Sequence, residues 1–258
     1  KSHWTAYQLM TRHTLPALVT LTDAGIPVML FKGNTHNAGR TSGQIRLSGD
    51  MDVLVPREMF CDAVALLTKN GWPTKWLTAK RLAEIFSSHH GFNLKNTNGG
   101  NIDLHHRPTH NEISNAALDV IWKRAVQIDF HNIKVLSASP VDRFAFACHA
   151  IGTTSTNSLS MLDFVNALQS ETLTASAVFD AARNIDKELK MTSALLYCAK
   201  KLGNKRARQM LDESPPVSIN VSRMAHYFAF APVDRGSVRW FGGCFIRRYM
   251  GIKGVSDK

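Results

Sequence analysis

Residues 49–55, Gly-Asp-Met-Asp-Val-Leu-Val, place two carboxylates at the point where a turn runs into an apolar stretch typical of a buried strand. Side chains alternate between the two faces of a strand, so Asp50 and Asp52 face one way while Met51 and Val53 face the other. Two carboxylates at this spacing can share hard divalent cations such as Mg²⁺ and leave coordination positions open for phosphate oxygens. The same short motif also occurs at solvated strand ends, so its meaning depends on the neighbouring segments.

Two neighbouring segments add charged groups to the same predicted sheet. The apolar run 26–31 reads as a buried strand that ends in Lys32-Gly33, so a cation and a glycine lie at a strand exit. Residues 91–105 read as a hairpin around a run of Asn and Gly, and its second arm carries a third carboxylate, Asp103. Three acids and a lysine suited to phosphate therefore fall on one candidate sheet.

The order and spacing of these residues resemble the nucleotidyltransferase superfamily that includes DNA polymerase beta. Within it, the chain is most similar to the bacterial family labelled simply nucleotidyltransferase family protein. The resemblance covers about residues 20–170 and is carried by Lys32-Gly33, by Arg46 with Asp50-Met51-Asp52, by His89 or His90, by Asp103-Leu104-His105, by His149 and by Leu162-Asp163. The chain departs from the wider superfamily at Gly33-Asn34, where Gly-Ser or Gly-Gly usually begins the triphosphate-binding helix.

The resemblance implies a fold, an activity and a set of site residues. The fold is α+β: a polymerase beta-like core of a mixed sheet flanked by helices, followed by a helical region. The activity is transfer of a nucleoside monophosphate from an NTP to a hydroxyl or similar acceptor, with release of pyrophosphate. The catalytic and metal-binding residues are Asp50, Asp52 and Asp103, which hold Mg²⁺ or Mn²⁺, and the nucleotide-binding residues are Lys32, Gly33, Arg46, Gly49, His90 and His105.

The chain of 258 residues divides into two predicted domains. Residues 1–137 form the α/β nucleotidyltransferase core, and residues 138–258 form a mainly helical domain with a basic tail. A second hairpin is expected over residues 125–136, turning at His131-Asn132. Helices are expected from Pro140 and at about residues 158–169, 174–186, 189–202 and 204–212.

The histidines and cysteines leave several alternatives open. The hairpin is rich in histidine (His89, His90, His105, His106 and the nearby His110), which permits a zinc site, a role in orienting Asp103 or contacting phosphate, or ordinary surface and core histidines. The four cysteines, Cys61, Cys148, Cys198 and Cys244, include no C-x-x-C pair. Reduced, buried thiols are expected, and these suit the cytoplasm.

The charge balance favours anionic partners. The chain has 31 Lys and Arg against 20 Asp and Glu, a formal net charge of +11 that attracts nucleotide, nucleic acid or anionic lipid. After residue 220 the arginines alternate with aromatic residues, a pattern that can track a phosphate backbone, lie at a membrane interface or form a solvated face over a small core. No apolar run approaches the ~18 residues of a membrane span, so no transmembrane segment is expected.

Two other functions fit the same residues. One is an RNA-modifying, toxin-like nucleotidyltransferase, and the other is a catalytically silent nucleotide-binding module of the same fold. The expected partners are an NTP and a small-molecule or peptide acceptor, with RNA as a further candidate. The sequence does not fix the acceptor, the base or the oligomeric state.

Overall fold

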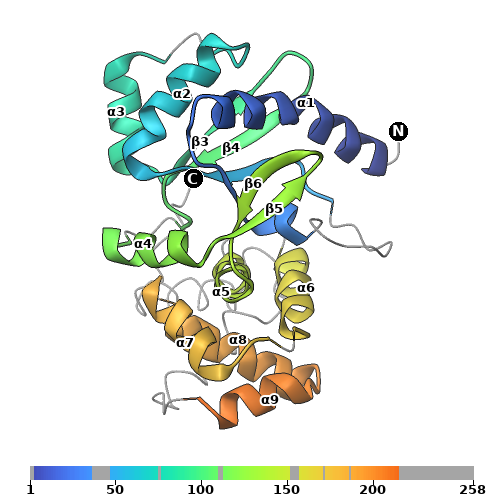
Figure 1. The fold of residues 1–258 in the computed structure, drawn as a ribbon. Coiled ribbons are helices and arrows are strands. Elements are labelled where there is room, and N and C mark those ends of the chain that lie inside the picture. The colour runs from blue at the N-terminus through green and yellow to red at the C-terminus, as the bar shows by residue number, and fades with distance from the viewer. Residues whose placement is uncertain are drawn as a thin grey trace, which may run out of the picture. The chain divides into compact units, whose positions relative to one another are not determined.

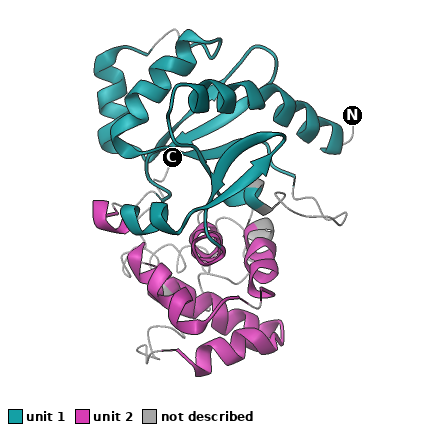
Figure 2. Cartoon of the chain, viewed as in Figure 1, with its two compact units in different colours: residues 1–110, 118–139 teal, residues 111–117, 140–258 magenta. Residues whose placement is uncertain are grey.

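The computed structural model (Figure 1) describes residues 3–36, 47–74, 77–109, 113–151, 157–170, 172–185 and 187–214. These residues belong to two compact units, which Figure 2 colours separately. Unit 1 comprises Lys1–His110 and Leu118–Ser139, and unit 2 comprises Asn111–Ala117 and Pro140–Lys258.

The strands of the described residues all lie in unit 1 and form one sheet (Figure 1). They are β1 (Met29–Leu30), β2 (Met51–Leu54), β3 (Gly91–Lys95), β4 (Asn101–His105), β5 (Val126–Phe130) and β6 (Ile133–Ser137). Their order in the sheet is β3-β4-β2-β1-β6-β5. β2 pairs parallel with β4, and β1 pairs parallel with β6, while the other pairs are antiparallel.

The sheet is therefore mixed, and with the helical region that follows it confirms the predicted α+β class. The two predicted hairpins are β3–β4 and β5–β6. The second turns at His131 and Asn132, whose φ angles of 52° and 66° are the left-handed values that a tight two-residue hairpin turn requires.

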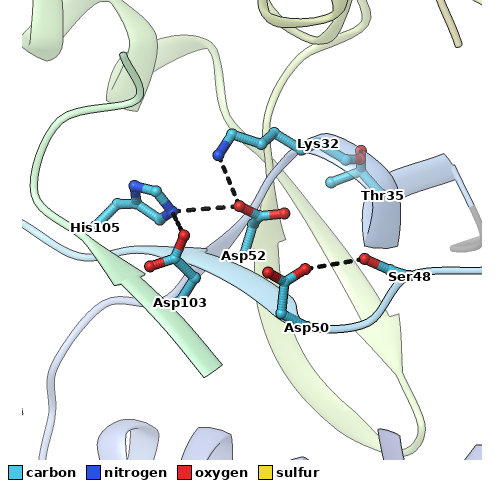
Figure 3. A network of polar contacts seen from close by, with 7 residues as sticks. All are labelled: Lys32, Thr35, Ser48, Asp50, Asp52, Asp103 and His105. Atoms are coloured by element: carbon cyan, nitrogen blue, oxygen red, sulfur yellow. Dashed lines mark hydrogen bonds and ion pairs between the residues drawn. The ribbon is translucent and has the colours of Figure 1, made fainter. Parts of the chain in front are cut away.

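Helices and sheet of unit 1 share an apolar core. The helical segments are α1 (His3–Asp23), η1 (Lys32–His36), η2 (Arg57–Met59), α2 (Phe60–Lys69) and α3 (Ala79–Ser88), and α4 (Asn115–Arg124) follows the hairpin. Leu18 of α1 and Val64 of α2 pack into one buried cluster with Met51 and Val53 of β2. The predicted alternation along β2 is thus confirmed, because Asp52 lies between these core residues and projects from the opposite face (Figure 3).

Helix α1 anchors the β3–β4 hairpin. The side-chain amide of Asn96, in the hairpin turn, donates to the His13 carbonyl at 3.0 Å, and the Asn101 N–H donates to the Thr14 hydroxyl at 3.0 Å. The hairpin that carries Asp103 is therefore tied to the helix at its turn.

The regular elements among the described residues of unit 2 are helices. It contains α5 (Pro140–Ala150), α6 (Asn157–Leu168), α7 (Ala175–Asn184), α8 (Glu188–Lys201) and α9 (Lys205–Asp212), within two residues of the predicted positions. Thr174 and Asn204 cap α7 and α9 by accepting the N–H of the third helical residue. The rings of Phe144 and Phe164 stack at 4.4 Å between α5 and α6.

The predicted basic tail, residues 220–258, lies outside the described residues, which end at residue 214. Among the residues that are described, helices with the length and apolar character needed to cross a membrane are absent.

Candidate active site

Strand pairing brings the predicted carboxylates together. The parallel register of β2 and β4 sets Asp52 opposite Asp103 and Leu54 opposite His105. Because β2 also pairs antiparallel with β1, the end of β1 delivers Lys32 to the same place. Figure 3 shows the four side chains of Lys32, Asp52, Asp103 and His105 converging on one another.

The polar contacts centre on one oxygen of Asp52. The Lys32 ammonium lies 2.7 Å from Asp52 Oδ1, and His105 Nε2 lies 3.2 Å from the same atom (Figure 3). His105 Nε2 also lies 2.9 Å from Asp103 Oδ2, so one ring nitrogen bridges the two carboxylates. The His105 side chain is fully buried, while those of Asp103 and Lys32 are 26% and 28% exposed. The network is thus closed on the histidine side and open to solvent on the other.

Asp50 lies at the entrance to β2, outside this tight cluster. Its carboxylate accepts a hydrogen bond from the Ser48 hydroxyl at 3.1 Å. The atoms of Asp52, Asp103 and His105 that can bind a metal lie within 4.8 Å of one another. Among the described residues, the group of atoms that could hold one ion therefore includes a histidine, and Asp50 lies beside this group.

The electrostatics separate Asp50 from the other two acids. Burial raises the pKa of the Asp52 carboxyl, but the Lys32 ammonium and the His105 ring outweigh burial and hold that pKa well below its ordinary value. Burial also opposes ionisation of Asp103, and His105 again brings the pKa below its ordinary value. Burial and the negative charges of its two neighbours raise the pKa of Asp50. Of the three acids, Asp50 is therefore the one whose ionised form is disfavoured by the site.

His105 is held from several sides. Burial and the Lys32 charge lower its pKa, but the contacts with the two carboxylates more than compensate, so the pKa is raised. Its ring meets Phe31 edge-on at 4.9 Å and lies 4.8 Å from the ring of His90. A Cβ at Gly91 would come within 2.9 Å of His105 Nδ1, so the glycine permits this packing.

The neighbouring His106 has an ordinary core role. Its Nε2 bonds the His89 carbonyl at 2.8 Å, and its ring stacks on Phe86 at 4.7 Å. Burial lowers its pKa to about 4, which keeps the ring neutral at physiological pH. Of the histidines that permitted a zinc site, His105 takes part in a potential metal cluster of the described residues, and His110 lies outside those residues.

The backbone at Lys32 adopts a conformation that is unusual for a lysine. Its φ angle is 56°, in the left-handed region, which costs a non-glycine residue about 1–2 kcal/mol. The Thr35 hydroxyl bonds the Lys32 carbonyl at 2.6 Å, and the Lys32 ammonium lies 4.9 Å from the centre of the Phe31 ring. These contacts hold the strained turn and direct the lysine towards Asp52.

The other predicted residues are placed as follows. Gly33 is buried in η1 directly after Lys32. Gly49 is exposed, and its carbonyl accepts a hydrogen bond from the Asn101 amide at 2.8 Å. Arg46 lies outside the described residues.

Three residues near the site carried too weak a signal in the sequence to be predicted as part of it. Ser48 stands two positions before Asp50, a common arrangement for a hydroxyl that bonds a carboxylate. Phe31 and Gly91 lie next to His105 because the fold brings distant segments together, and nothing in their local sequence indicates this contact.

The arrangement suits hard cations and phosphate. Carboxylate oxygens are the ligands that Mg²⁺ prefers, and a mixed set of carboxylates and imidazole also suits Mn²⁺. A lysine beside such a cluster offers a point charge for phosphate.

The chain was compared with known families, curated proteins and solved structures. The model of a family described as "Uncharacterised nucleotidyltransferase" matches residues 5–203. Among solved structures, an antigenic nucleotidyltransferase-like protein from Paracoccidioides brasiliensis is similar, with 13% identity, a TM-score of 0.39, and coverage of 76% of this chain and 98% of that one. The search of curated proteins found no match. The classification of the chain therefore rests on the family model, which covers more than half of the residues.

Proposed function

Because the chain belongs to the family of uncharacterised nucleotidyltransferases, we propose that it transfers a nucleoside monophosphate from an NTP to a hydroxyl acceptor. In this reaction the acceptor oxygen bonds to the α-phosphorus, the bond to the bridging oxygen breaks, and pyrophosphate leaves. The observation that carries the proposal is the in-register pairing of Asp52 with Asp103, with Asp50 and Lys32 beside them.

The proposed metal ligands are Asp50, Asp52 and Asp103. Carboxylate oxygens suit Mg²⁺ or Mn²⁺; Asp52 and Asp103 belong to the potential metal cluster, and Asp50 lies beside it. When bound, such ions would neutralise phosphate charge and make the acceptor hydroxyl easier to ionise. The low pKa values of Asp52 and Asp103 support this assignment, since both groups are ready to bind a cation at neutral pH.

The other residues have roles that follow from their positions. Lys32 is partly exposed and would attract the phosphates as a point charge. His105 contacts both carboxylates through one nitrogen and would fix their relative orientation. Asp103 is the more exposed of the two paired acids and would take the proton of the acceptor hydroxyl. Gly33, Arg46, Gly49 and His90 are proposed to contact the nucleotide.

We place the reaction in the cytoplasm. The described cysteines, Cys61, Cys148 and Cys198, are free thiols, and burial raises the pKa of Cys148 to about 12, which makes it unreactive. Free, unreactive thiols are typical of proteins in a reducing compartment.

Labelled NTPs provide the test. The protein is incubated with Mg²⁺, each NTP labelled at the α-phosphate and a panel of small molecules, peptides and RNA, and the products are identified by mass spectrometry. Asp52→Asn should lower turnover at least about a hundredfold, because it removes transition-state electrostatics. Asp62→Asn is the matched control, since Asp62 is exposed on α2.

The outcomes separate the proposed function from its alternatives. Normal turnover by a folded Asp52→Asn protein would refute the site assignment. Binding of Mg²⁺-NTP without any labelled product would indicate a catalytically silent binding module, and label found only in RNA would indicate the RNA-modifying alternative.

A further inference from the structure

Lys32 already sits on the oxygen of Asp52 that His105 also contacts. Its ammonium lies 2.7 Å from Asp52 Oδ1, and His105 Nε2 contacts the same oxygen at 3.2 Å. A divalent ion typically lies about 2.1 Å from a carboxylate oxygen, so an ion on Oδ1 and the ammonium would be at most about 5 Å apart. At that distance, in a site where Asp52 is nearly buried, two cations repel each other strongly.

The lysine can leave, whereas the histidine cannot. The Lys32 side chain is 28% exposed and has a flexible four-carbon stem that can carry the ammonium into solvent. His105 is fully buried and packed between Phe31 and Gly91, so its ring has no comparable freedom. The strained backbone of Lys32 fixes the base of its side chain but leaves the stem free to rotate.

The Lys32 ammonium offsets negative charge in the metal-free site. Asp52 and Asp103 lie opposite each other on β2 and β4, and Asp50 lies beside them, so three acids share this part of the site. Without a metal, one ammonium offsets part of this charge. With a divalent ion bound, the two positive charges of the ion offset Asp52 and Asp103, and the ammonium becomes available to an incoming polyanion.

We propose that Lys32 is an internal counter-cation, which a divalent metal ion displaces from Asp52 and which then becomes available to the phosphates of the nucleotide. The last step rests on the proposed function, whereas the exchange at Asp52 does not. The exchange makes metal binding a condition for full phosphate affinity, because the ammonium is released to phosphate when it leaves Asp52.

Metal binding by the nucleotide-free protein tests the first part. Mn²⁺ affinity is measured by the loss of the free-ion electron paramagnetic resonance signal for four proteins: unmodified, Lys32→Met, Lys32→Arg and Lys80→Met. Lys32→Met should bind Mn²⁺ at least about tenfold more tightly, because the competing charge is gone. Lys32→Arg keeps the charge and should gain no affinity. Lys80 is exposed on α3, so Lys80→Met controls for the lower net charge.

Chemical labelling of the unmodified protein tests the displacement itself and does not depend on any variant folding. The protein is treated briefly with an amine-acylating reagent, with or without Mg²⁺, and labelling at Lys32 and Lys80 is quantified by mass spectrometry. Mg²⁺ should raise labelling at Lys32 several-fold and leave Lys80 unchanged. Equal labelling of Lys32 with and without Mg²⁺ would overturn the inference, as would unchanged or weaker Mn²⁺ binding by folded Lys32→Met.

Both measurements omit nucleotide, so they fail or succeed independently of turnover. Metal-dependent exposure of Lys32 without any nucleotidyl transfer would uphold the exchange and refute the proposed function. Turnover without that exposure would uphold the proposed function and refute the exchange.

Discussion

Replacing Gly91 by alanine tests whether the packing of His105 controls the carboxylates. Gly91 pairs with His105 across β3 and β4. A Cβ added there would lie 2.6 Å from the Leu104 carbonyl oxygen, 2.9 Å from His105 Nδ1 and 3.0 Å from His105 Cγ. The first is a backbone atom and the other two belong to a fully buried ring, so the clash has no easy relief.

The expected cost has two parts. Overpacking of this kind destabilises a protein by about 1–3 kcal/mol, because strand β3 must move away from β4. The same displacement tilts the His105 ring, whose Nε2 lies 2.9 Å from Asp103 and 3.2 Å from Asp52. Disturbing a group that orients metal ligands typically lowers metal affinity by about 10–100-fold.

Gly100→Ala is a matched control on the same hairpin. A Cβ at Gly100 would lie 2.5 Å from the His13 carbonyl oxygen and 2.7 Å from Asn96 Nδ2, so its clash is as severe as that at Gly91. Neither glycine has a positive φ, so sterics alone decide the effect of both substitutions. The Gly100 clash falls at the α1 anchor of the hairpin and does not involve His105.

Urea unfolding and Mn²⁺ titration are then compared for the two variants. Both should lose about 1–3 kcal/mol of unfolding free energy, and only Gly91→Ala should lose Mn²⁺ affinity, by about tenfold or more. If the two variants lose Mn²⁺ affinity equally, or if Gly91→Ala keeps it, then the packing of His105 does not position the carboxylates.

Two further predictions concern charge. Asp50→Asn should raise the unfolding free energy of the metal-free protein at pH 7 by about 0.5–2 kcal/mol. The reason is that burial and two neighbouring acids raise the pKa of Asp50 and so penalise its ionised form in the folded state. A lower melting temperature of the variant would show instead that this carboxylate is structural. His106 has a folded-state pKa of about 4 against an ordinary 6.5, so the unfolded chain binds a proton at this histidine first as the pH falls. The unfolding free energy should therefore fall as the pH drops from 6.5 towards 4. In urea unfolding, His106→Gln should flatten this dependence on pH, and an unchanged dependence would assign the effect to other groups.

The sequence supports the prediction of the sheet and of the three acids for local reasons. Alternation along 50–55 separates Asp52 from Met51 and Val53, and the structure has these two in the core with Asp52 on the opposite face. The two hairpins can be predicted from the sequence because each consists of adjacent segments joined by turn residues. Helix bounds in unit 2 follow from caps such as Thr174 and Asn204, whose side chains act within their own segment.

The contacts within the site depend on long-range pairing and were not predictable. His105 reaches Asp52 because β4 pairs parallel with β2 in one particular register, which alternation within either strand does not specify. The Lys32–Asp52 pair likewise requires β1 to lie on the other side of β2. The sequence therefore indicates which residues share a face, but not that the ring nitrogen of His105 joins the two acids while Asp50 stands apart.

The chain as a whole is positively charged, whereas the site contains three acids, and this difference affects the order in which cation and nucleotide bind. A net charge of +11 attracts polyanions such as a nucleoside triphosphate, while the three clustered acids repel the same ligand at close range. Among the described residues, the Lys32 ammonium already pairs with Asp52, so it cannot neutralise both the acids and the phosphates. Under the proposed function, we therefore expect a further cation to enter before or together with the nucleotide. The same local repulsion predicts weaker binding of metal-free NTP than of its metal complex, the proposed substrate.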